Sequence, residues 1–270
     1  MFSNIRIVLV KPSHPGNIGA VARAMKNMSL SRLYMVAPTD FPSFEASQRA
    51  ASAGDVLQNA VVVDSLEQAL QGCALVAGTT SRLRNVTWPQ IDARAGGELL
   101  YAESAQHEVA LVFGNERTGL LNEEMEQCQY LVNIPTSDEY PSLNLSQAVQ
   151  VMTYEIMMAS RAGNATVTTE PKYALDRLAS MDQLNGLYVH ILEAMRQFDF
   201  FGTRNHEQVM RRMRCLFGRA RVSVRELQIL RGMIKIAQGK KQPGRKKTDV
   251  ANAVEVGAEK RTQMNANERK

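Results

Sequence analysis

Six short apolar runs, separated by stretches with the spacing of helices, restrict the fold of this sequence most. Each run is four to six residues long and rich in Val, Ile and Leu, which is typical of strands buried on both faces of a parallel sheet. Parallel neighbours need crossover connections, and the helical stretches supply them. We therefore predict an α/β domain with right-handed crossovers. The runs are residues 5–10, 33–36, 61–64, 74–78, 109–113 and 130–134.

Helix-start signals lie between these runs. Residues 17–28 are rich in Ala and Met. Ser65 precedes Gln68 by three residues, which predicts a capping box. Two glutamates directly follow Asn122, and acidic side chains suit the first turn of a helix. A long helix is expected after Asn144.

The sequence changes character after about residue 160. Residues 1–160 form the predicted α/β domain, and residues 161–171 (RAGNATVTTEP) have the composition of a linker. Residues 172–238 carry apolar side chains at helical spacing, which predicts a small all-helical extension. Residues 239–270 are basic and polar and predict a disordered tail.

The charge of the chain is unevenly distributed. Residues 1–165 contain 11 Lys/Arg and 16 Asp/Glu, whereas residues 166–270 contain 21 and 11, so the two parts carry net charges of −5 and +10. Between Arg204 and Arg225 there are seven arginines and a single acid, Glu207. This asymmetry favours a catalytic body joined to a module that binds a polyanion such as nucleic acid. The alternative is an ordinary soluble surface with a basic tail.

The cysteines and the hydropathy of the chain argue against several other classes of protein. The three cysteines, Cys73, Cys128 and Cys215, lie far apart and have neither metal-ligand spacing nor the pattern of a disulfide framework. No apolar run approaches the length of a membrane span, and the N-terminal residues read as a first strand and not as a signal peptide. We expect a cytoplasmic protein with reduced thiols and no metal.

The stretch LVFGNERTGL, residues 111–120, places a glycine at each end of a loop after an apolar run. Gly114 and Gly119 have the separation found in a phosphate-binding P-loop, but Leu120 and Leu121 stand where that motif needs Lys and Ser/Thr. The loop is therefore expected to approach a ligand other than a nucleoside triphosphate. A tight strand-to-helix turn is the alternative.

Three other loops carry candidate groups. In HPGNIGAVAR, Arg23 lies one helical turn after Gly19, so a helix N-terminus and a guanidinium could meet a phosphodiester. A capped helix with a solvated arginine explains the same spacing. In PSLNLSQA, Asn144 could simply cap the following helix. The same loop could instead contact a ligand, and the sequence fits both interpretations. A weaker fourth candidate, the hydroxyl cluster at residues 79–81, follows a strand, where open α/β sheets bind ligands.

At these residues the chain resembles a known family. NIGAVAR (17–23), LVFGNERTGL (111–120) and PSLNLSQA (141–148) occur in the order and at the separations of the three motifs of the SPOUT class of RNA methyltransferases. The resemblance is closest to bacterial tRNA ribose methyltransferases that modify cytidine or uridine at position 32 of the anticodon loop. It covers residues 1 to about 160, and the helical extension to about residue 238 is also similar. One motif alone would be weak, whereas three in order are specific.

The resemblance implies a fold, a cofactor and a set of site residues. The parallel sheet would carry a deep trefoil knot, formed where the chain after about Ile134 threads a loop, and the chain would be a homodimer. The knotted loops would bind S-adenosylmethionine. The positions that match the family's cofactor-binding residues are Thr79, Thr80, Ser81, Gly114, Asn115, Glu116, Gly119, Ile134, Ser142, Leu143 and Asn144.

The same resemblance implies the reaction and the RNA contacts. Arg23 is the family's catalytic residue, and one subunit's Arg23 would serve the other's cofactor. A guanidinium stays protonated, so we expect Arg23 to clamp a phosphate beside the attacking 2′-hydroxyl and not to act as the base. Asn17 would orient the same nucleotide. With tRNA as the partner, the expected RNA-binding arginines are Arg82, Arg84, Arg211, Arg212, Arg214, Arg219 and Arg221.

Two other functions remain compatible with the sequence. A related ribose methyltransferase could act on ribosomal RNA, although the helical extension argues for tRNA. A catalytically silent RNA-binding protein would not need Asn17, Arg23 and all three cofactor loops together.

Overall fold

The computed structural model describes residues 2–81, 88–162, 177–202 and 205–239. The chain divides into two compact units, Met1–Arg231 and Gly232–Lys270. The predicted linker from residue 163 onward and the tail from residue 240 onward lie outside the described residues, as do Arg82 and Arg84. The domain boundaries therefore stay a prediction.

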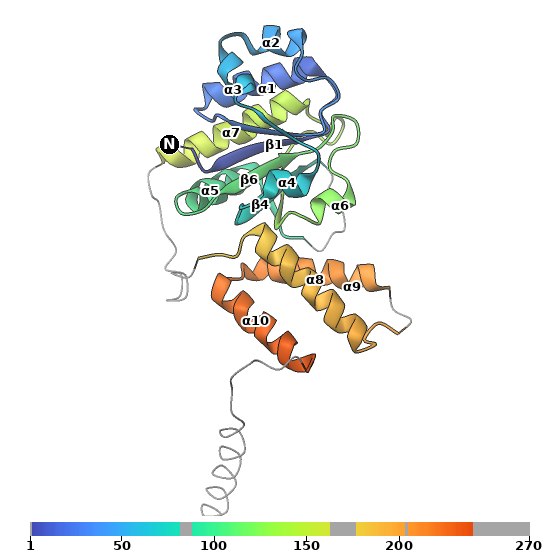
Figure 1. The fold of residues 1–270 in the computed structure, drawn as a ribbon. Helices are drawn as coiled ribbons and strands as arrows, with labels where there is room; N and C mark the ends of the chain where they lie inside the picture. Colours follow the sequence, from blue (N-terminus) through green and yellow to red (C-terminus); the bar gives the residue numbers. More distant parts are fainter. Residues whose placement is uncertain (1, 82–87, 163–176, 203–204, 240–270) are drawn as a thin grey trace, which may run out of the picture. The chain divides into compact units, whose positions relative to one another are not determined.

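A seven-stranded sheet forms the centre of the first unit (Figure 1). All of its pairings are parallel, in the order β3-β2-β1-β6-β4-β7-β5. The predicted parallel α/β architecture is therefore confirmed, and each of the six apolar runs overlaps a strand. The strands are β1 (Ile5–Val10), β2 (Arg32–Val36), β3 (Val61–Val63), β4 (Leu75–Thr80), β5 (Gln90–Asp92), β6 (Val109–Phe113) and β7 (Tyr130–Asn133).

The helices connect these strands or follow them. In residues 1–162 the described helices are α1 (Pro15–Asn27), α2 (Phe44–Ala50), the 3₁₀ turn η1 (Ala51–Ala53), α3 (Gly54–Gln58), α4 (Leu66–Leu70), α5 (Ala93–Ser104), α6 (Asn122–Met125) and α7 (Leu145–Arg161). The helical extension contains α8 (Met181–Gln197), α9 (His206–Ala220) and α10 (Val224–Ala237). The expected capping box at Ser65 forms, and Ser223 makes a second capping box with Glu226 at the start of α10.

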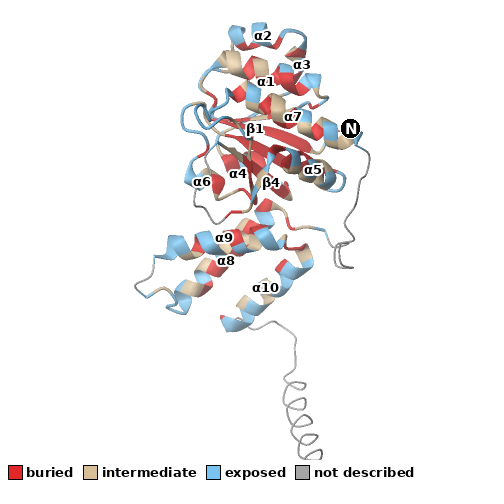
Figure 2. Ribbon diagram, turned by 180° about the vertical axis from the view of Figure 1, so that it is seen from behind, coloured by how far each residue is buried: buried red, intermediate tan, exposed pale blue. Residues whose placement is uncertain are grey.

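The central strands are buried on both faces, as near-continuous apolar runs predict (Figure 2). In β1, Ile5, Ile7 and Leu9 join the core beneath α1, α5 and α7, whereas Val8 and Val10 are buried on the opposite face. Strand β3 is different, because Val61 and Val62 are 40% and 50% exposed. The expectation of two-sided burial was wrong for this strand, which is the edge of the sheet and is covered less than its neighbours.

Helices α5 and α7 approach each other closely because α5 contains two consecutive glycines. A Cβ on Gly97 would lie 2.7 Å from the backbone carbon of Glu155 in α7, and a Cβ on Gly96 would lie 3.0 Å from a Val132 methyl group. This helix was not predicted from the sequence, because two consecutive glycines weaken an isolated helix. Helices α2 and α3 and the three-residue strand β5 were also not predicted.

The structural order of these elements agrees with the SPOUT fold. Helix α7 follows β7 and packs against both α1 and α5, so the last part of the domain lies beside its first helix. The threading that would make this arrangement a knot stays a prediction.

Candidate functional site

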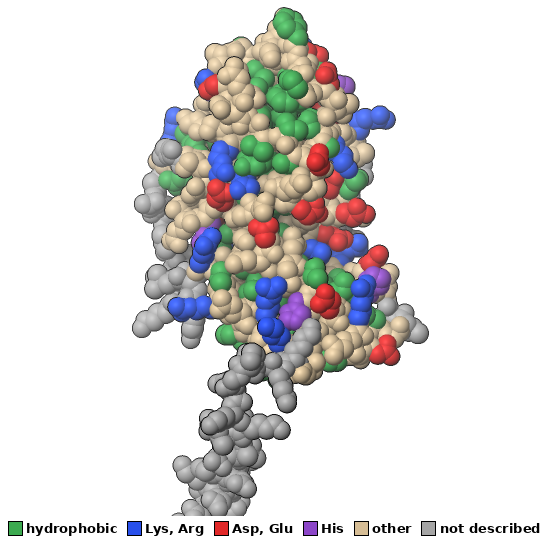
Figure 3. All heavy atoms as spheres, in the orientation of Figure 1, with side chains coloured by type: hydrophobic (Ala, Val, Ile, Leu, Met, Phe, Trp, Pro, Cys, Tyr) green, Lys and Arg blue, Asp and Glu red, His purple; other side chains and the backbone are tan. Residues whose placement is uncertain are grey.

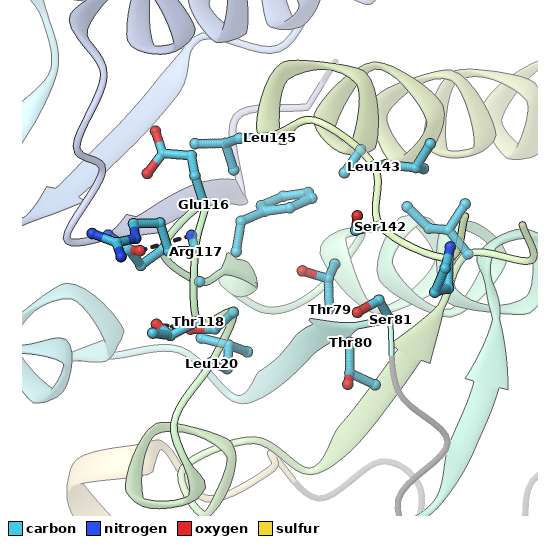
Figure 4. Close-up of a pocket in the computed structure, with 17 residues that line it drawn as sticks. Thr79, Thr80, Ser81, Glu116, Arg117, Thr118, Leu120, Ser142, Leu143 and Leu145 are labelled. Atoms are coloured by element: carbon cyan, nitrogen blue, oxygen red, sulfur yellow. Dashed lines mark hydrogen bonds between the residues drawn. The ribbon is translucent and has the colours of Figure 1, made fainter. Parts of the chain in front are cut away.

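A pocket of about 310 Å³ opens at the carboxyl ends of β4, β6 and β7. Ligands of open α/β sheets bind at this edge, outside the carboxyl ends of the strands. Three loops that are far apart in the sequence face one another there, and Figure 4 shows Thr79–Ser81 opposite the loop that carries Glu116 to Leu120. The residues lining it are Thr79, Thr80, Ser81, Phe113, Gly114, Asn115, Glu116, Arg117, Thr118, Gly119, Leu120, Ile134, Pro141, Ser142, Leu143, Leu145 and Ala148.

The loop after β6 closes on itself, and this explains both of its glycines. The Gly119 amide donates to the Asn115 carbonyl at 2.8 Å. A Cβ on Gly114 would lie 2.1 Å from the carbonyl carbon of Gly119, so no larger residue fits there. Gly119 itself has φ +66°, a conformation that L residues with a side chain adopt only with strain. The glycines therefore give the loop a compact shape with its backbone at the pocket.

The Glu116 carboxylate anchors this loop to the start of α1. It accepts hydrogen bonds from the Ser13 amide and hydroxyl, both at 2.9 Å, and from the His14 amide at 3.2 Å. The Asn17 side-chain amide donates a fourth, at 3.1 Å. Burial alone would raise the pKa of Glu116, but the bonds from Asn17 and Ser13 outweigh it and lower the pKa below its ordinary value. The carboxylate thus fixes the loop geometry and faces donors on both oxygens.

Asn17 joins all three motif loops. Its Nδ2 donates to Glu116, and its Oδ1 accepts from the Asn144 side-chain amide at 3.1 Å. Asn144 in turn caps α7, since its Oδ1 accepts from the Ser146 amide at 2.9 Å. One asparagine on α1 therefore connects the loop after β6 with the loop before α7.

Ten of the eleven predicted cofactor-binding residues line the pocket. The exception, Asn144, supports it through the bonds to Asn17 and Ser146. Sequence reasoning missed seven lining residues; five of them are apolar, which a search for polar and glycine residues does not reveal, and the other two are Arg117 and Thr118. The missed lining residues are Phe113, Arg117, Thr118, Leu120, Pro141, Leu145 and Ala148.

Arg23 lies outside the pocket of its own chain. It is on α1 and exposed, and within the described ranges it makes no hydrogen bond or ion pair. Its guanidinium is therefore presented to solvent or to another molecule.

The predicted RNA-binding arginines of the helical extension divide into two groups. Arg211 pairs with Glu126 at 2.5 Å, Arg221 pairs with Glu103, and Arg214 lies 4.8 Å from the centre of the Tyr188 ring. These three contact other parts of the same chain. Arg212 and Arg219 form the second group: both are exposed on α9, and neither makes an ion pair with any residue that the structure describes. They are therefore accessible to a phosphate.

Comparison with known proteins gives the family. A model of the SpoU rRNA methylase family matches residues 4–154, and a model of the C-terminal domain of the tRNA methyltransferase TrmJ matches residues 182–248. The tRNA (cytidine/uridine-2'-O-)-methyltransferase TrmJ of Pectobacterium atrosepticum is 45% identical, over 88% of this chain and 98% of its own length. The chain belongs to the TrmJ group of SpoU methylases. The resemblance seen in the sequence motifs is thereby confirmed.

Other TrmJ proteins and structures agree with this assignment. The tRNA (cytidine/uridine/adenosine-2'-O-)-methyltransferase TrmJ of Pseudomonas aeruginosa is 44% identical, over 88% of this chain and 97% of its own length. The crystal structure of TrmJ from Z. mobilis matches with a TM-score of 0.74 and 28% identity, over 86% of this chain and 97% of that one. A probable methylase from Haemophilus influenzae matches with a TM-score of 0.58 and 38% identity, over 89% and 98%.

The pocket of this SpoU methylase fits the family's methyl donor, S-adenosylmethionine. Leu120, Leu143 and Leu145 offer an apolar wall for a purine, and hydroxyls at residues 79–81 and 142 offer hydrogen bonds to a ribose or to an amino acid group. Within the described residues no cluster of His, Cys, Asp and Glu is arranged to hold a metal, and no helix is long and apolar enough to cross a membrane.

Proposed function

We propose that this chain transfers a methyl group from S-adenosylmethionine to the ribose 2′-hydroxyl of cytidine or uridine at position 32 of the tRNA anticodon loop. We further propose that it acts in the cytoplasm as a homodimer. The observation that carries the proposal is the convergence of three separate motif loops on one pocket, tied together through Asn17.

The choice of tRNA rests on the second half of the chain. The match to the TrmJ C-terminal domain and the names of the 44–46% identical relatives both support it. Positively charged side chains bind a phosphate backbone, and Arg212 and Arg219 are exposed and could make such contacts. The contribution of residues 82 and 84 stays a prediction.

The bound cofactor would supply an electrophilic methyl group with a good leaving group already attached, so the protein contributes mainly by positioning. The residues proposed to hold the cofactor are the eleven that match the family's motifs. Ten of them line the pocket, and Asn144 supports it through its bonds to Asn17 and to the start of α7. Asn17 has both ends of its amide bonded inside the chain, so we propose that it positions the loops. Its second N–H and second lone pair can still orient the target nucleotide.

Proton removal from the 2′-hydroxyl needs a group other than Glu116. That carboxylate faces four donors and has a lowered pKa, and both facts make it a weak base. We propose that Arg23 binds the phosphate next to the target ribose and stabilises the developing alkoxide, while the phosphate assists proton removal. The position of Arg23 outside its own pocket supports its acting in the partner subunit's site.

The test is methyl transfer from radiolabelled S-adenosylmethionine to unmodified tRNA, followed by mapping of the methylated nucleotide. Wild type should label a single anticodon-loop ribose, and Arg23→Ala should lose most of this activity while still binding the cofactor. Arg94→Ala is the matched control, because Arg94 is 78% exposed on α5 and pairs only weakly, at 3.8 Å, with Glu155. Cofactor binding without any labelled tRNA would overturn the proposal.

Ribosomal RNA is the second candidate substrate, and the description of the matching SpoU family model favours it. The same assay separates the two, because ribosomal RNA and tRNA can be offered to the enzyme in parallel. Preferential labelling of ribosomal RNA would replace the proposed substrate and retain the chemistry.

A further inference from the structure

The turn between α8 and α9 is rich in phenylalanine, although it lies at the surface. Of the four residues that directly follow α8, positions 198–201, three are Phe198, Phe200 and Phe201. Phe198 and Phe200 are 50% and 47% exposed. Single exposed apolar side chains are common, but a cluster of large ones indicates an interaction surface.

The backbone of this turn is fixed by the end of α8. The Phe200 amide donates to the Met195 carbonyl at 3.0 Å, and the Asp199 amide donates to the Arg196 carbonyl at 3.1 Å. This pair of bonds is a Schellman motif, in which Asp199 occupies the left-handed position with φ +51°. The phenylalanines are therefore presented by a preorganised turn, which lowers the entropy lost when a partner binds.

Ring contacts connect the turn to the next helix. The rings of Phe200 and Phe201 meet edge to face, with centroids 5.8 Å apart at 81°. Phe201 also contacts His206, the first residue of α9, at 6.0 Å and 68°. Phe201 supports Phe200 from within the turn and holds it beside the helix that carries the exposed arginines.

The charge around this turn is strongly positive. Residues 196–221 contain seven arginines against Asp199 and Glu207. Arg212 lies six residues into α9 from His206, roughly 9 Å along the helix axis. Figure 3 shows basic and hydrophobic side chains, with a few acidic ones among them, on the face of the helical region that it displays. Such a surface is complementary to a polyanion that also has flat apolar groups.

We infer that Phe198 and Phe200 stack on unpaired bases of the RNA substrate, an inference that rests on the proposed action on tRNA. Unpaired bases stack on aromatic side chains, and stacking tolerates any base because every base has a π-face. Arg212 and Arg219, the exposed arginines of α9, hold the phosphates of the same strand. The turn is thus a binding surface of the helical extension, separate from the cofactor pocket.

The experiment measures the Kd of unmodified tRNA by fluorescence anisotropy for wild type and for Phe198→Leu and Phe200→Leu. Leucine keeps an apolar side chain but has no aromatic face. Each variant should bind at least about fivefold more weakly, with an unchanged slope of log Kd against log salt. Phe200→Trp should bind as tightly as wild type. Val189→Ala, which changes a 58% exposed apolar side chain elsewhere on α8, should also be unaffected.

Two contrasts make the result decisive. A fully paired RNA duplex should bind wild type and the leucine variants equally, because it offers no unpaired base. Arg212→Gln should lower the salt slope by about 0.7–0.9 if it contacts one phosphate, which the leucine variants should not do. Leucine variants that bind tRNA like wild type, or that change the oligomeric mass and not RNA affinity, would overturn the inference. Wild type that neither binds nor methylates tRNA would instead refute the proposed function.

Discussion

Replacing Glu116 with Gln is the sharpest test of the loop anchor. A carboxylate can accept from donors on both oxygens, whereas Gln turns one oxygen into an NH₂ group that faces two donors. If the NH₂ faces Asn17 and the His14 amide, two hydrogen bonds to a charged acceptor are lost, each worth about 1.5–3 kcal/mol. Partial solvation and rotation of nearby groups reduce the sum, so we expect a loss of about 2–4 kcal/mol in the free energy of unfolding.

The pH dependence of this effect is fixed by the lowered pKa of Glu116. A depressed carboxyl pKa contributes stability above the ordinary value of 4.5, and that contribution is lost as pH falls through the lowered value. Denaturant unfolding should be measured at pH 7 and at stepwise lower pH. The difference in unfolding free energy between wild type and Glu116→Gln should become smaller below about pH 4.5. Glu123→Gln is the control, because Glu123 is exposed on α6.

If this difference in unfolding free energy is the same at every pH, the lost contacts do not depend on the charge of Glu116, and the carboxylate is not the anchor of the loop. Affinity for S-adenosylmethionine, measured by calorimetry, should fall in parallel with stability at pH 7. A variant with normal cofactor affinity would show that the loop keeps its shape without the anchor.

Three further predictions concern glycines and thiols. Gly97→Ala should destabilise the protein by about 1–3 kcal/mol, because the new methyl group meets the backbone of α7. Its control, Gly54→Ala, should be neutral or stabilising by up to about 1 kcal/mol, because the φ of Gly54 is −59°, which is helical, and no atom lies near the new methyl group. Thermal unfolding compares the two. Gly119→Ala should cost about 1–2 kcal/mol from its positive φ alone and weaken cofactor binding measured by calorimetry; an affinity equal to wild type would contradict a required left-handed turn. Cys73 and Cys128 are buried with pKa values raised to about 11 and about 12 by burial, so a thiol reagent at pH 8 should label them only at the rate of unfolding, as mass spectrometry can follow.

The strands were predictable because burial on two faces leaves a strong signal in the sequence. The apolar runs located β1 and β6 to the residue, and the capping box at Ser65 marked the start of α4. Helix α5 was missed because its glycines serve contact with α7, a tertiary reason that opposes local helix propensity. Strand β5 was missed because two of its three residues, Gln90 and Asp92, are polar, so it leaves no apolar run like that of β3.

Much of the pocket lining could be predicted from the sequence, whereas the hydrogen bonds that connect its loops could not. Spacing alone could not show that Asn17 joins Glu116 and Asn144, since these partners lie about a hundred residues away in the sequence. The same limit applies to the arginines of α9. Charge counting could not separate Arg221, which pairs with Glu103, from Arg219, which is exposed.

The bridge through Asn17 also orders events during synthesis of the chain. Its two bonds span 99 and 127 residues, so the cofactor pocket has no local precursor that a shorter segment could form. A nascent chain that has not yet released Asn144 from the ribosome lacks the bond that links α1 with α7. Occupancy by S-adenosylmethionine is consequently a signature of the finished domain, and a methyltransferase of this design is inactive until its whole N-terminal domain has folded.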